Sequence, residues 1–465
     1  MADFATFKAH FQGDVVTPDD ADYSKAIARW AVNAQRRAKV VAFVKNEEDV
    51  RAAIIYARDS GLPIAIRGGG HSPAGASSSE GGLVIDLSRY LNEAKVDPEK
   101  RVVYVGGGAL WDVVDKESIK YGLATVGGTV NHTGVGGLVL GGGYGWLSPK
   151  HGLAIDNLVQ ATVVTADGSI LTASDTENPD LFFGIRGGGC NFGVVTEFVL
   201  RLHPQREKVY AGMLVFPPPM LEKLVNVTQK WSERTGEKEA MMQVLTMGPD
   251  GKASNFPSFL FFNGSEAEGR ENFKAFFDLG PVADFTKEIP YEELNTLQNQ
   301  TQFHGQGMYM KGIAQRKPDF ESITKAFDHV QKVSGPEFKA NILFEYFPLA
   351  KINAVSSNST AFRRDPTSSV LVLMNWKENT EENAERGRIV AHELANFIVD
   401  GQQGVSPTQI LGYSNYDPGA VSGKKDVMSD KAKAIFADNY PRLQKIKKRY
   451  DPDNIFRKWF PITPA

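Results

Sequence analysis

Three consecutive glycines stand between a short apolar stretch and a histidine near the start of the chain. Residues 63–71 read PIAIRGGGH, so Gly68, Gly69 and Gly70 leave the backbone bare directly before His71. A tight turn needs one residue with positive φ rather than three. Consecutive glycine N–H groups can instead form a concave site for an anionic ligand that lies on the backbone. The pattern predicts ligand binding, and the alternative is that His71 only caps a turn.

Closely spaced glycines recur in three more stretches before residue 194. They read VGGGALWD (105–112), VGGTVNHTGVGGLVLGGGYGW (126–146) and IRGGGCNFG (185–193). A nicotinamide-binding fingerprint is a single GxGxxG that closes the first strand of a βαβ unit. Here Gly134, Gly136 and Gly137 come late and lack the acidic residue at the expected distance, and no GxxxxGK[ST] loop exists. The ligand is therefore not obviously a nicotinamide cofactor.

Composition narrows the class of protein. The chain has 465 residues, which suggests two or three domains, and a formal net charge of −3 without a long basic block gives nucleic-acid binding little support. One cysteine, Cys190, excludes an internal disulfide framework and a cysteine zinc site, and no metal site is expected. No apolar run of 18 residues and no signal-peptide pattern are present, so we predict a cytoplasmic protein without a membrane partner.

The elements that must position the glycines read as an α+β domain. Helical periodicity covers Glu47–Asp59, with Gly61 as its C-terminal stop, between a strand near residue 40 and the strand 63–67. The other expected elements are a strand in 101–108, a helix in 109–122, a β-hairpin in 156–174 that turns at Asp167-Gly168, and a strand in 192–204. The glycine stretches fall in the loops between these elements.

After Pro204 the glycine triplets stop and a second α/β domain begins. Apolar strands are expected in 213–217, 256–264, 342–348 and 369–376, and amphipathic helices near 219–234, 265–278, 318–334 and 379–399. This alternation predicts a sheet with one face packed by helices. The basic stretch 440–461 has no obvious place in that sheet.

Several long stretches together resemble the berberine-bridge-enzyme-like branch of the vanillyl-alcohol-oxidase flavoproteins. They are GDVVTPDDADYSKAIARW, NEEDVRAAIIYARDSGLPIAIRGGGHSPAG, GVGGLVLGGGYGWLSPKHGLAIDNLV, DLFFGIRGGGCNFGVVTEFVLRLHP, YSNYDP and NYPRLQKIKKRYDPDNIF. The resemblance implies a two-part FAD-binding domain, residues 1–204 and 411–465. This domain would flank a substrate domain, residues 205–410, with an antiparallel sheet covered by helices.

The resemblance also implies how the cofactor is held. The turn before His71 would cradle the FAD pyrophosphate, and His71 would bond covalently to the flavin 8α-methyl group; a neutral imidazole is a suitable nucleophile. The other implied cofactor-binding positions are Arg67, Gly68, Gly69, Gly70, Ser72, Gly128, His132, Thr133, Gly134, Gly136, Gly137, Gly142, Gly143, Tyr144, Gly145, Gly193, Val194 and Asn454.

The chain departs from the family pattern at three places. Val130 stands where many members carry a second cysteine link, so one covalent bond is expected, with His132 lining the pocket or hydrogen bonding. Cys190 replaces a usual glycine, and it is either redox-active or a small buried filler. The segment 370–374 is wholly apolar, although members often place there a Gln, Asp or Glu that supports the base; Asn375 is its first polar residue.

The resemblance makes YSNY the stretch that bears the catalytic base, with Tyr413 and Tyr416 as candidates and Tyr416 preferred. Residues three apart in a regular strand point to opposite faces, so either one tyrosine faces the flavin or the stretch turns. A tyrosine base at neutral pH needs a depressed pKa, which a nearby cation could supply. The alternatives are that both tyrosines only pack on the flavin, or that the base is Asn375, Lys377 or Glu345.

The activity implied is FAD-dependent oxidation of a small molecule by hydride loss from an alcohol, sugar or amine carbon. The residue before GVGG is expected to gate oxygen, and Thr133 is close in shape to valine, which favours O₂ as the acceptor and hydrogen peroxide as a product. The alternatives are a flavin dehydrogenase with another acceptor, a flavin-binding protein with little turnover, and a nicotinamide dehydrogenase.

Overall fold

The strand before the glycine triplet belongs to a small mixed sheet. The computed structural model describes residues 4–248, 254–364, 367–402, 410–417, 419 and 425–465. The strand order in this sheet is β1 (Asp14–Val16), β2 (Val40–Phe43), β4 (Leu83–Asp86) and β3 (Ile64–Arg67). Because β3 runs parallel to β4, the two strands end together, and Arg67 forms a 2.8 Å ion pair with Asp86 there. The glycine triplet thus leaves the carboxyl end of a buried sheet.

Helix α3 (Glu47–Asp59) packs on this sheet and has the predicted bounds. It begins where the side chain of Asn46 accepts the Asp49 N–H at 3.0 Å, which satisfies one of the free donors of the first turn. It ends before Gly61, which has a φ of 66° that favours glycine. The apolar face of α3 is buried with α1 (Phe4–His10).

A second, antiparallel sheet follows. Its strand order is β5 (Ala94–Asp97), β6 (Val102–Gly106), β10 (Val194–Arg201), β8 (Leu158–Val164) and β9 (Ile170–Ser174). The predicted hairpin is β8–β9, with Gly168 at a φ of 84° in its turn. A further pair joins β7 (Leu123–Ala124) to β11 (His203–Pro204).

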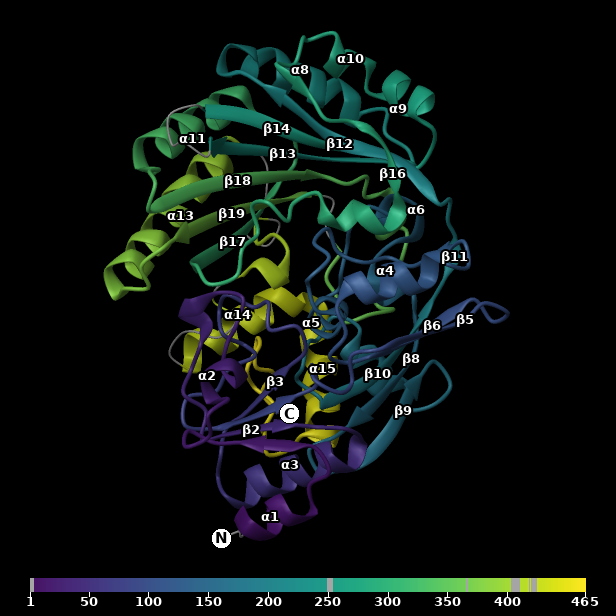
Figure 1. Cartoon of the computed structure of the whole chain (residues 1–465), viewed down its shortest axis with the longest axis vertical. Coiled ribbons are helices and arrows are strands. Elements are labelled where there is room, and N and C mark those ends of the chain that lie inside the picture. Colours follow the sequence, from purple (N-terminus) through teal and green to yellow (C-terminus); the bar gives the residue numbers. More distant parts are fainter. Residues whose placement is uncertain (1–3, 249–253, 365–366, 403–409, 418, 420–424) are drawn as a thin grey trace.

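A large antiparallel sheet fills the other half of the molecule (Figure 1). Its order is β15 (Ala283–Asp284), β12 (Lys208–Phe216), β14 (Ser254–Phe262), β13 (Glu239–Met247), β18 (Phe338–Tyr346), β19 (Ser368–Trp376) and β17 (Gly307–Gln315), and β16 (Lys287–Pro290) also pairs with β12. The four predicted strands are present, whereas β13 and β17 were not predicted, because their polar residues interrupt the apolar pattern.

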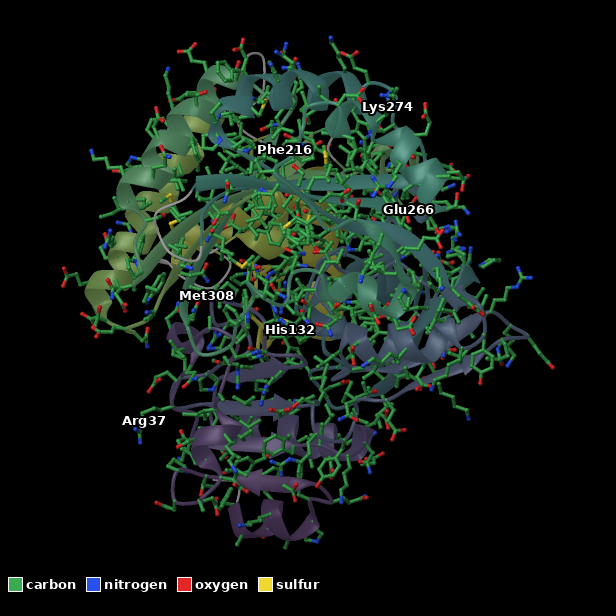
Figure 2. All side chains as sticks on the ribbon, turned by 45° about the horizontal axis from the view of Figure 1, so that its top comes forward. Arg37, His132, Phe216, Glu266, Lys274 and Met308 are labelled. Atoms are coloured by element: carbon green, nitrogen blue, oxygen red, sulfur yellow. The ribbon has the colours of Figure 1, made fainter. Side chains whose placement is uncertain are left out.

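Helices cover one face of the large sheet. They are α8 (Leu221–Ser232), α9 (Glu266–Asn272), α10 (Lys274–Phe277), α11 (Phe320–Val333) and α13 (Glu381–Asp400). Figure 2 shows Phe216 on this side of the sheet and Met308 on the side toward the smaller sheets. That second face is also buried, because it packs against Trp30 and Trp146. The predicted helix-covered face is therefore present, and the opposite face, for which no cover was predicted, packs against the N-terminal half.

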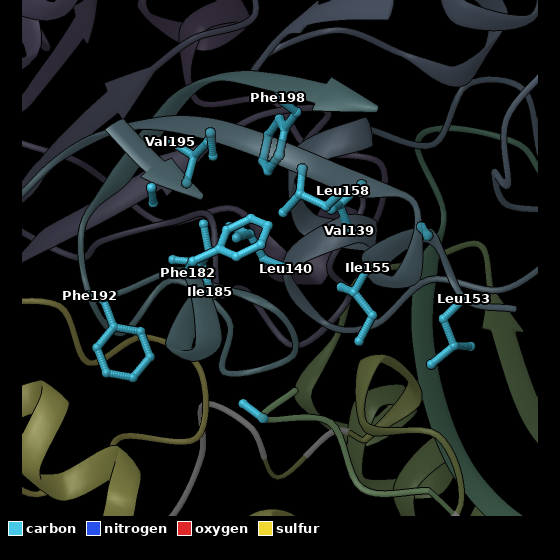
Figure 3. Packing of buried hydrophobic residues seen from close by; sticks show 14 of the residues in the cluster. Val139, Leu140, Leu153, Ile155, Leu158, Phe182, Ile185, Phe192, Val195 and Phe198 are labelled. Atoms are coloured by element: carbon cyan, nitrogen blue, oxygen red, sulfur yellow. The ribbon is translucent and has the colours of Figure 1, made fainter. Parts of the chain in front are cut away.

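The C-terminal segment returns to the N-terminal half. Helices α14 (Lys425–Phe436) and α15 (Tyr440–Tyr450), yellow in Figure 1, lie beside the smaller sheets. Lys447 and Asp451 form a fully buried 2.6 Å ion pair, and the Lys447 ammonium also donates to the Asn191 carbonyl at 2.7 Å. One apolar core joins both segments, and Figure 3 shows its part around Phe182 and Phe198. These contacts explain why the basic stretch has no place in the large sheet.

The remaining helices are short. They are α2 (Tyr23–Ala26), α4 (Trp111–Ile119), α5 (Val135–Leu140), α6 (Ser148–His151), α7 (Pro179–Ile185) and α12 (Ala350–Asn353), and the 3₁₀ turns are Val32–Ala34, Ala154–Asp156, Pro218–Met220, Tyr291–Thr296, Ser414–Tyr416 and Ala437–Asn439. Within the described ranges, no helix has both the length and the apolar character needed to cross a bilayer. The fold is α+β, as predicted.

Candidate active site

A cavity with about 1600 Å³ of space lies between the glycine stretches and the large sheet. The glycines on its wall come from four loops of the N-terminal half. The opposite wall is formed by β17, β18 and β19, which present Met310, Leu343, Leu371 and Leu373. The glycine stretches therefore converge on one cavity.

Two glycine loops touch each other directly. A Cβ atom on Gly69 would lie 2.6 Å from the Gly134 Cα, and one on Gly134 would lie 2.4 Å from the Gly69 nitrogen, so neither position admits a side chain. Gly70 has a φ of 70°, a conformation that glycine adopts without strain. Gly137 borders the cavity with nothing within 4 Å of its Cβ position, so bare backbone faces open space there.

His71 lies on the cavity wall between two aromatic neighbours. The Trp30 ring stacks on the imidazole with 3.9 Å between centroids. The His71 Nε2 atom is 3.3 Å from His132 Nδ1, so one ring donates a hydrogen bond to the other. Burial, followed by the rings of His132 and His304, lowers the pKa of His71 to about 3. The imidazole is therefore neutral at physiological pH and has a lone pair on one nitrogen.

A buried carboxylate faces the two tyrosines that were expected to carry the base. Glu345 of β18 accepts hydrogen bonds from the Tyr416 hydroxyl at 2.9 Å and from the Tyr144 hydroxyl. Burial, the largest effect, raises the pKa of Glu345 to about 7 from an ordinary value of 4.5. The 370–374 segment is apolar, but the neighbouring strand supplies the acid.

The YSNY stretch turns, so both tyrosines reach the cavity. Ser414–Tyr416 form a 3₁₀ turn, and the rings of Tyr413 and Tyr416 meet edge to face at 5.0 Å. The Tyr413 hydroxyl accepts the Gly143 N–H at 3.0 Å and lies 2.7 Å from Asn415 Nδ2. Only Tyr416 of the two bonds to Glu345.

The tyrosine hydroxyls are poor bases in this environment. Burial is the largest of the effects that raise the pKa of Tyr416 well above its ordinary value, and the negative charge of Glu345 raises it further. Burial also raises the pKa of Tyr413. Neither Tyr413 nor Tyr416 therefore has the depressed pKa that a tyrosine base needs. Glu345, which titrates near neutral pH, is the stronger proton acceptor.

Most of the predicted cofactor positions line the cavity. They are Gly68, Gly69, Gly70, His71, Ser72, Gly128, Thr133, Gly134, Gly136, Gly137, Tyr144 and Gly193. Seven others do not, and they are Arg67, His132, Gly142, Gly143, Gly145, Val194 and Asn454.

Each residue away from the wall has a local partner or role. Arg67 pairs with Asp86, and His132 lies behind His71. A Cβ on Gly145 would lie 2.5 Å from the Gly127 carbonyl oxygen, and a Cβ on Gly142 or Gly143 would meet the Phe362 ring at 2.6 Å or the Leu138 side chain at 2.5 Å. Val194 is a buried strand residue, and Asn454 has a φ of 52° in the turn after α15.

The cavity wall also contains residues that sequence reasoning missed. They are Trp30, Ser77, Gln298, Gln302, Asn415 and the apolar residues of β17–β19. An acid inside the apolar run ILFEYF was the one visible signal for Glu345. Trp30 and Gln298 had none, because only the packing of distant segments brings them to the wall. Cys190 also lines the cavity, and burial raises the pKa of its thiol, so the reactive thiolate is disfavoured.

Comparison with known proteins gives the family of this chain. Residues 38–174 match the FAD binding domain family, and residues 412–462 match the family described as berberine and berberine like. FAD-linked oxidoreductase pgmH of Aspergillus terreus is 32% identical over 490 residues, which cover 100% of this chain and 96% of that protein. (R)-6-hydroxynicotine oxidase of Paenarthrobacter nicotinovorans is 30% identical and covers 97% of each chain. The crystal structure of 6-hydroxy-D-nicotine oxidase from Arthrobacter nicotinovorans has a TM-score of 0.87 at 28% identity, covering 98% of each chain.

These findings define an FAD-dependent oxidoreductase. The chain belongs to the berberine-bridge-enzyme-like family.

The residues of the cavity fit FAD. The bare backbone at Gly137 leaves room for a group in contact with the chain, and the buried Ser77 hydroxyl on the wall has no partner among the described residues. Glu345 is the one charged side chain among the described lining residues. The phosphates would therefore be held by backbone N–H groups and hydroxyls rather than by lysine or arginine.

Proposed function

We propose that the chain is an FAD-linked oxidase in which His71 carries the flavin covalently and the Glu345–Tyr416 pair removes the substrate proton. The bound flavin supplies the two-electron acceptor for a substrate hydride. Support comes from the position of the neutral His71 on the glycine side of one cavity and of the buried acid on the other. We also propose that residues 1–204 and 411–465 form the FAD-binding domain and residues 205–410 the substrate domain. Residues 403–409, at its far end, lie outside the described residues.

The roles of the chain's own residues follow from their bonds. Tyr416 donates to one Glu345 oxygen, so a proton taken by the tyrosine oxygen from a substrate can be matched by one passed to the carboxylate. Tyr144 donates to the other oxygen and holds the carboxylate in place. Tyr413 touches the Gly143 N–H instead and supports the loop that carries Tyr144.

A flavin-binding protein with little turnover is expected to lack an acid that supports the catalytic base. Since Glu345 supplies that acid, no observation favours this reading. The deciding experiment is an anaerobic panel of alcohols, sugars and amines in which loss of the oxidised flavin absorbance is followed. A protein whose flavin responds to dithionite but to none of the panel would contradict the proposed function.

The acceptor of the second half-reaction is proposed to be O₂, with hydrogen peroxide as the product. Thr133 lines the cavity, and its β-branched side chain has the shape of valine. We expect Thr133→Leu to slow reoxidation by air at least about tenfold, because the longer side chain fills space beside the flavin, while anaerobic reduction changes by a few-fold at most. Thr133→Val is the matched control and should reoxidise like the wild type. Wild-type reoxidation that takes many minutes would identify a dehydrogenase.

His132 is proposed to assist attachment of the flavin. When His71 Nε2 donates to His132 Nδ1, the other His71 nitrogen keeps the lone pair that must form the bond. We expect His132→Phe to slow covalent loading of apoprotein by added FAD about tenfold or more, measured as acid-stable flavin against time. His304→Phe is the control, because His304 contacts His132 but not the reacting ring. Equal slowing in both variants would show that the effect is structural.

A further inference from the structure

The wall of the cavity that faces away from the glycines is apolar. Neighbouring strands β17, β18 and β19 contribute Met310, Leu343, Leu371 and Leu373, and all four side chains are buried. Alternate residues of an antiparallel strand share a face, so the sheet offers these side chains as one continuous surface. A ligand that lies on this surface meets hydrocarbon on the side that faces the sheet.

A sugar does not suit this surface. Each of its hydroxyl groups needs a hydrogen-bond partner when it leaves water, and leucine and methionine provide none. A flat apolar ring gains from the same burial. The wall therefore selects a substrate whose body is apolar.

Glu345 is an acid without a cation. Its two oxygens accept the hydroxyls of Tyr144 and Tyr416, its third hydroxyl neighbour is Ser369, and the described lining residues of the cavity include no lysine or arginine. An ammonium group at this point would supply the missing charge through a short, charge-assisted hydrogen bond. An alcohol at the same point is neutral, so the negative charge of the carboxylate would have no opposite charge beside it.

A second cavity on the other side of the acid has the same character. It holds about 780 Å³ of space and shares Tyr144, Glu345 and Tyr413 with the first. Its wall combines Leu, Ile and Phe side chains with the hydroxyls of Thr367, Ser369 and Ser414, and Arg363 is the one other charged side chain among the described lining residues. A ligand that reaches past Glu345 therefore meets further apolar side chains, with a few hydroxyl groups between them.

We propose that the substrate is an apolar amine whose nitrogen binds at Glu345 and whose rings lie on the Met310–Leu373 wall. This inference rests on the proposed function and narrows its substrate class. The ammonium gives one N–H proton to the Glu345 carboxylate, which frees the nitrogen lone pair. The adjacent C–H bond then breaks, a C=N bond forms, and the hydride with its two electrons passes to FAD, as the family activity requires.

Proton removal favours an amine over an alcohol. An aliphatic ammonium group has a pKa near the lysine value of about 10.4, which is far below the pKa of an alcohol hydroxyl. Burial raises the pKa of Glu345 to about 7, and the groups that face it are the hydroxyls of Tyr144, Tyr416 and Ser369, with Tyr413 and Arg363 on the wall of the adjoining cavity. Proton transfer from the ammonium to Glu345 is therefore unfavourable by only a few pKa units.

The test uses two probes that differ only in the group facing Glu345. Benzylamine and benzyl alcohol are titrated into the flavin-loaded protein at pH 8, with cellobiose as the sugar, and dissociation constants are taken from the flavin difference spectrum. We expect benzylamine to bind at least about tenfold more tightly than benzyl alcohol and cellobiose to bind most weakly. Glu345→Gln should bring the amine-to-alcohol ratio close to one, and Glu345→Asp should keep a preference for the amine.

The outcomes separate this inference from the proposed function. A ratio near one in the wild type, tighter binding of the alcohol or sugar, or a preference that survives Glu345→Gln would overturn the amine assignment. The oxidase proposal is judged by flavin bleaching in the broader panel, so bleaching by alcohols or sugars with no amine preference would keep the oxidase and remove the amine. Normal flavin absorbance in both variants shows that they are folded.

Discussion

Replacing Glu345 by glutamine is expected to slow flavin reduction about 10²–10⁴-fold, the range typical for loss of a positioned base. Glutamine keeps the size of the side chain and can still bond to the two tyrosine hydroxyls, but it cannot accept the proton. Stopped-flow reduction under anaerobic conditions measures this step apart from reoxidation. Tyr416→Phe should share much of the loss, and the double variant should lose little more, because residues that act in one step are not additive.

Tyr413→Phe is the matched control for this prediction. It removes the hydroxyl of the neighbouring ring, which bonds to the Gly143 N–H and not to Glu345, so we expect a change of a few-fold only. Equal losses at Tyr413 and Tyr416 would point to a role in packing the flavin. Reduction within a few-fold of the wild type in Glu345→Gln would exclude the carboxylate as the base.

The pH dependence of the same step has a definite direction. Burial raises the pKa of Glu345 to about 7, and the ionised form is the proton acceptor. The second-order rate constant for reduction, which reports the free enzyme, should rise about tenfold per pH unit below 7 and level off above it. A tyrosine base would instead give a rise that continues toward about pH 9, because free tyrosine titrates near 10.

The same shift affects stability with the opposite sign. The pKa of Glu345 in the folded chain, about 7, lies above its ordinary value of 4.5, so the neutral acid stabilises the fold below 4.5. This contribution is lost as the pH rises through 7, because the unfolded chain gives up the proton first. Glu345→Gln should therefore melt no lower than the wild type at pH 8, and a loss of activity in this variant is then not a loss of folding.

Replacing His71 by alanine is expected to abolish covalent flavin. Wild-type protein should stay yellow after acid precipitation, and its peptide mass map should show one flavin adduct, on the peptide that contains His71. One adduct is expected because Val130 lines the cavity where a cysteine would make the second bond, and burial raises the pKa of the Cys190 thiol. The alanine variant should release all its flavin on denaturation, or never load it.

Two results would contradict the attachment prediction. Flavin found entirely in the wild-type supernatant would show that no bond forms. An additional adduct on Cys190 or His132 would show that a second one does. His304→Phe serves as the control for a nearby imidazole that does not reach the flavin cradle, and it should retain the acid-stable flavin.

Local sequence determined the features that depend on neighbours along the chain. The Asn46 cap and Gly61 set the two ends of α3, and Asp167-Gly168 set the β8–β9 hairpin. The bare backbone of 68–70 and the histidine after it are visible in the sequence, because close approach of two backbones requires glycine itself. Family resemblance then supplied the ligand, and the matched families confirm FAD.

Long-range packing decided the proton-handling part of the site. Glu345 meets Tyr416 and Tyr144 from segments that are separated by 71 and 201 residues, and the alternation along β18 places Glu345 on the same face as Leu343, toward the cavity. The 3₁₀ turn that brings both tyrosines to one side, and the His132 ring behind His71, arise in the same way. The pKa values follow from burial, which is a property of the assembled fold and not of any stretch of chain. A carboxylate in an apolar strand looks like an exception to the pattern until the neighbouring strands surround it, and only then does it titrate near neutral pH.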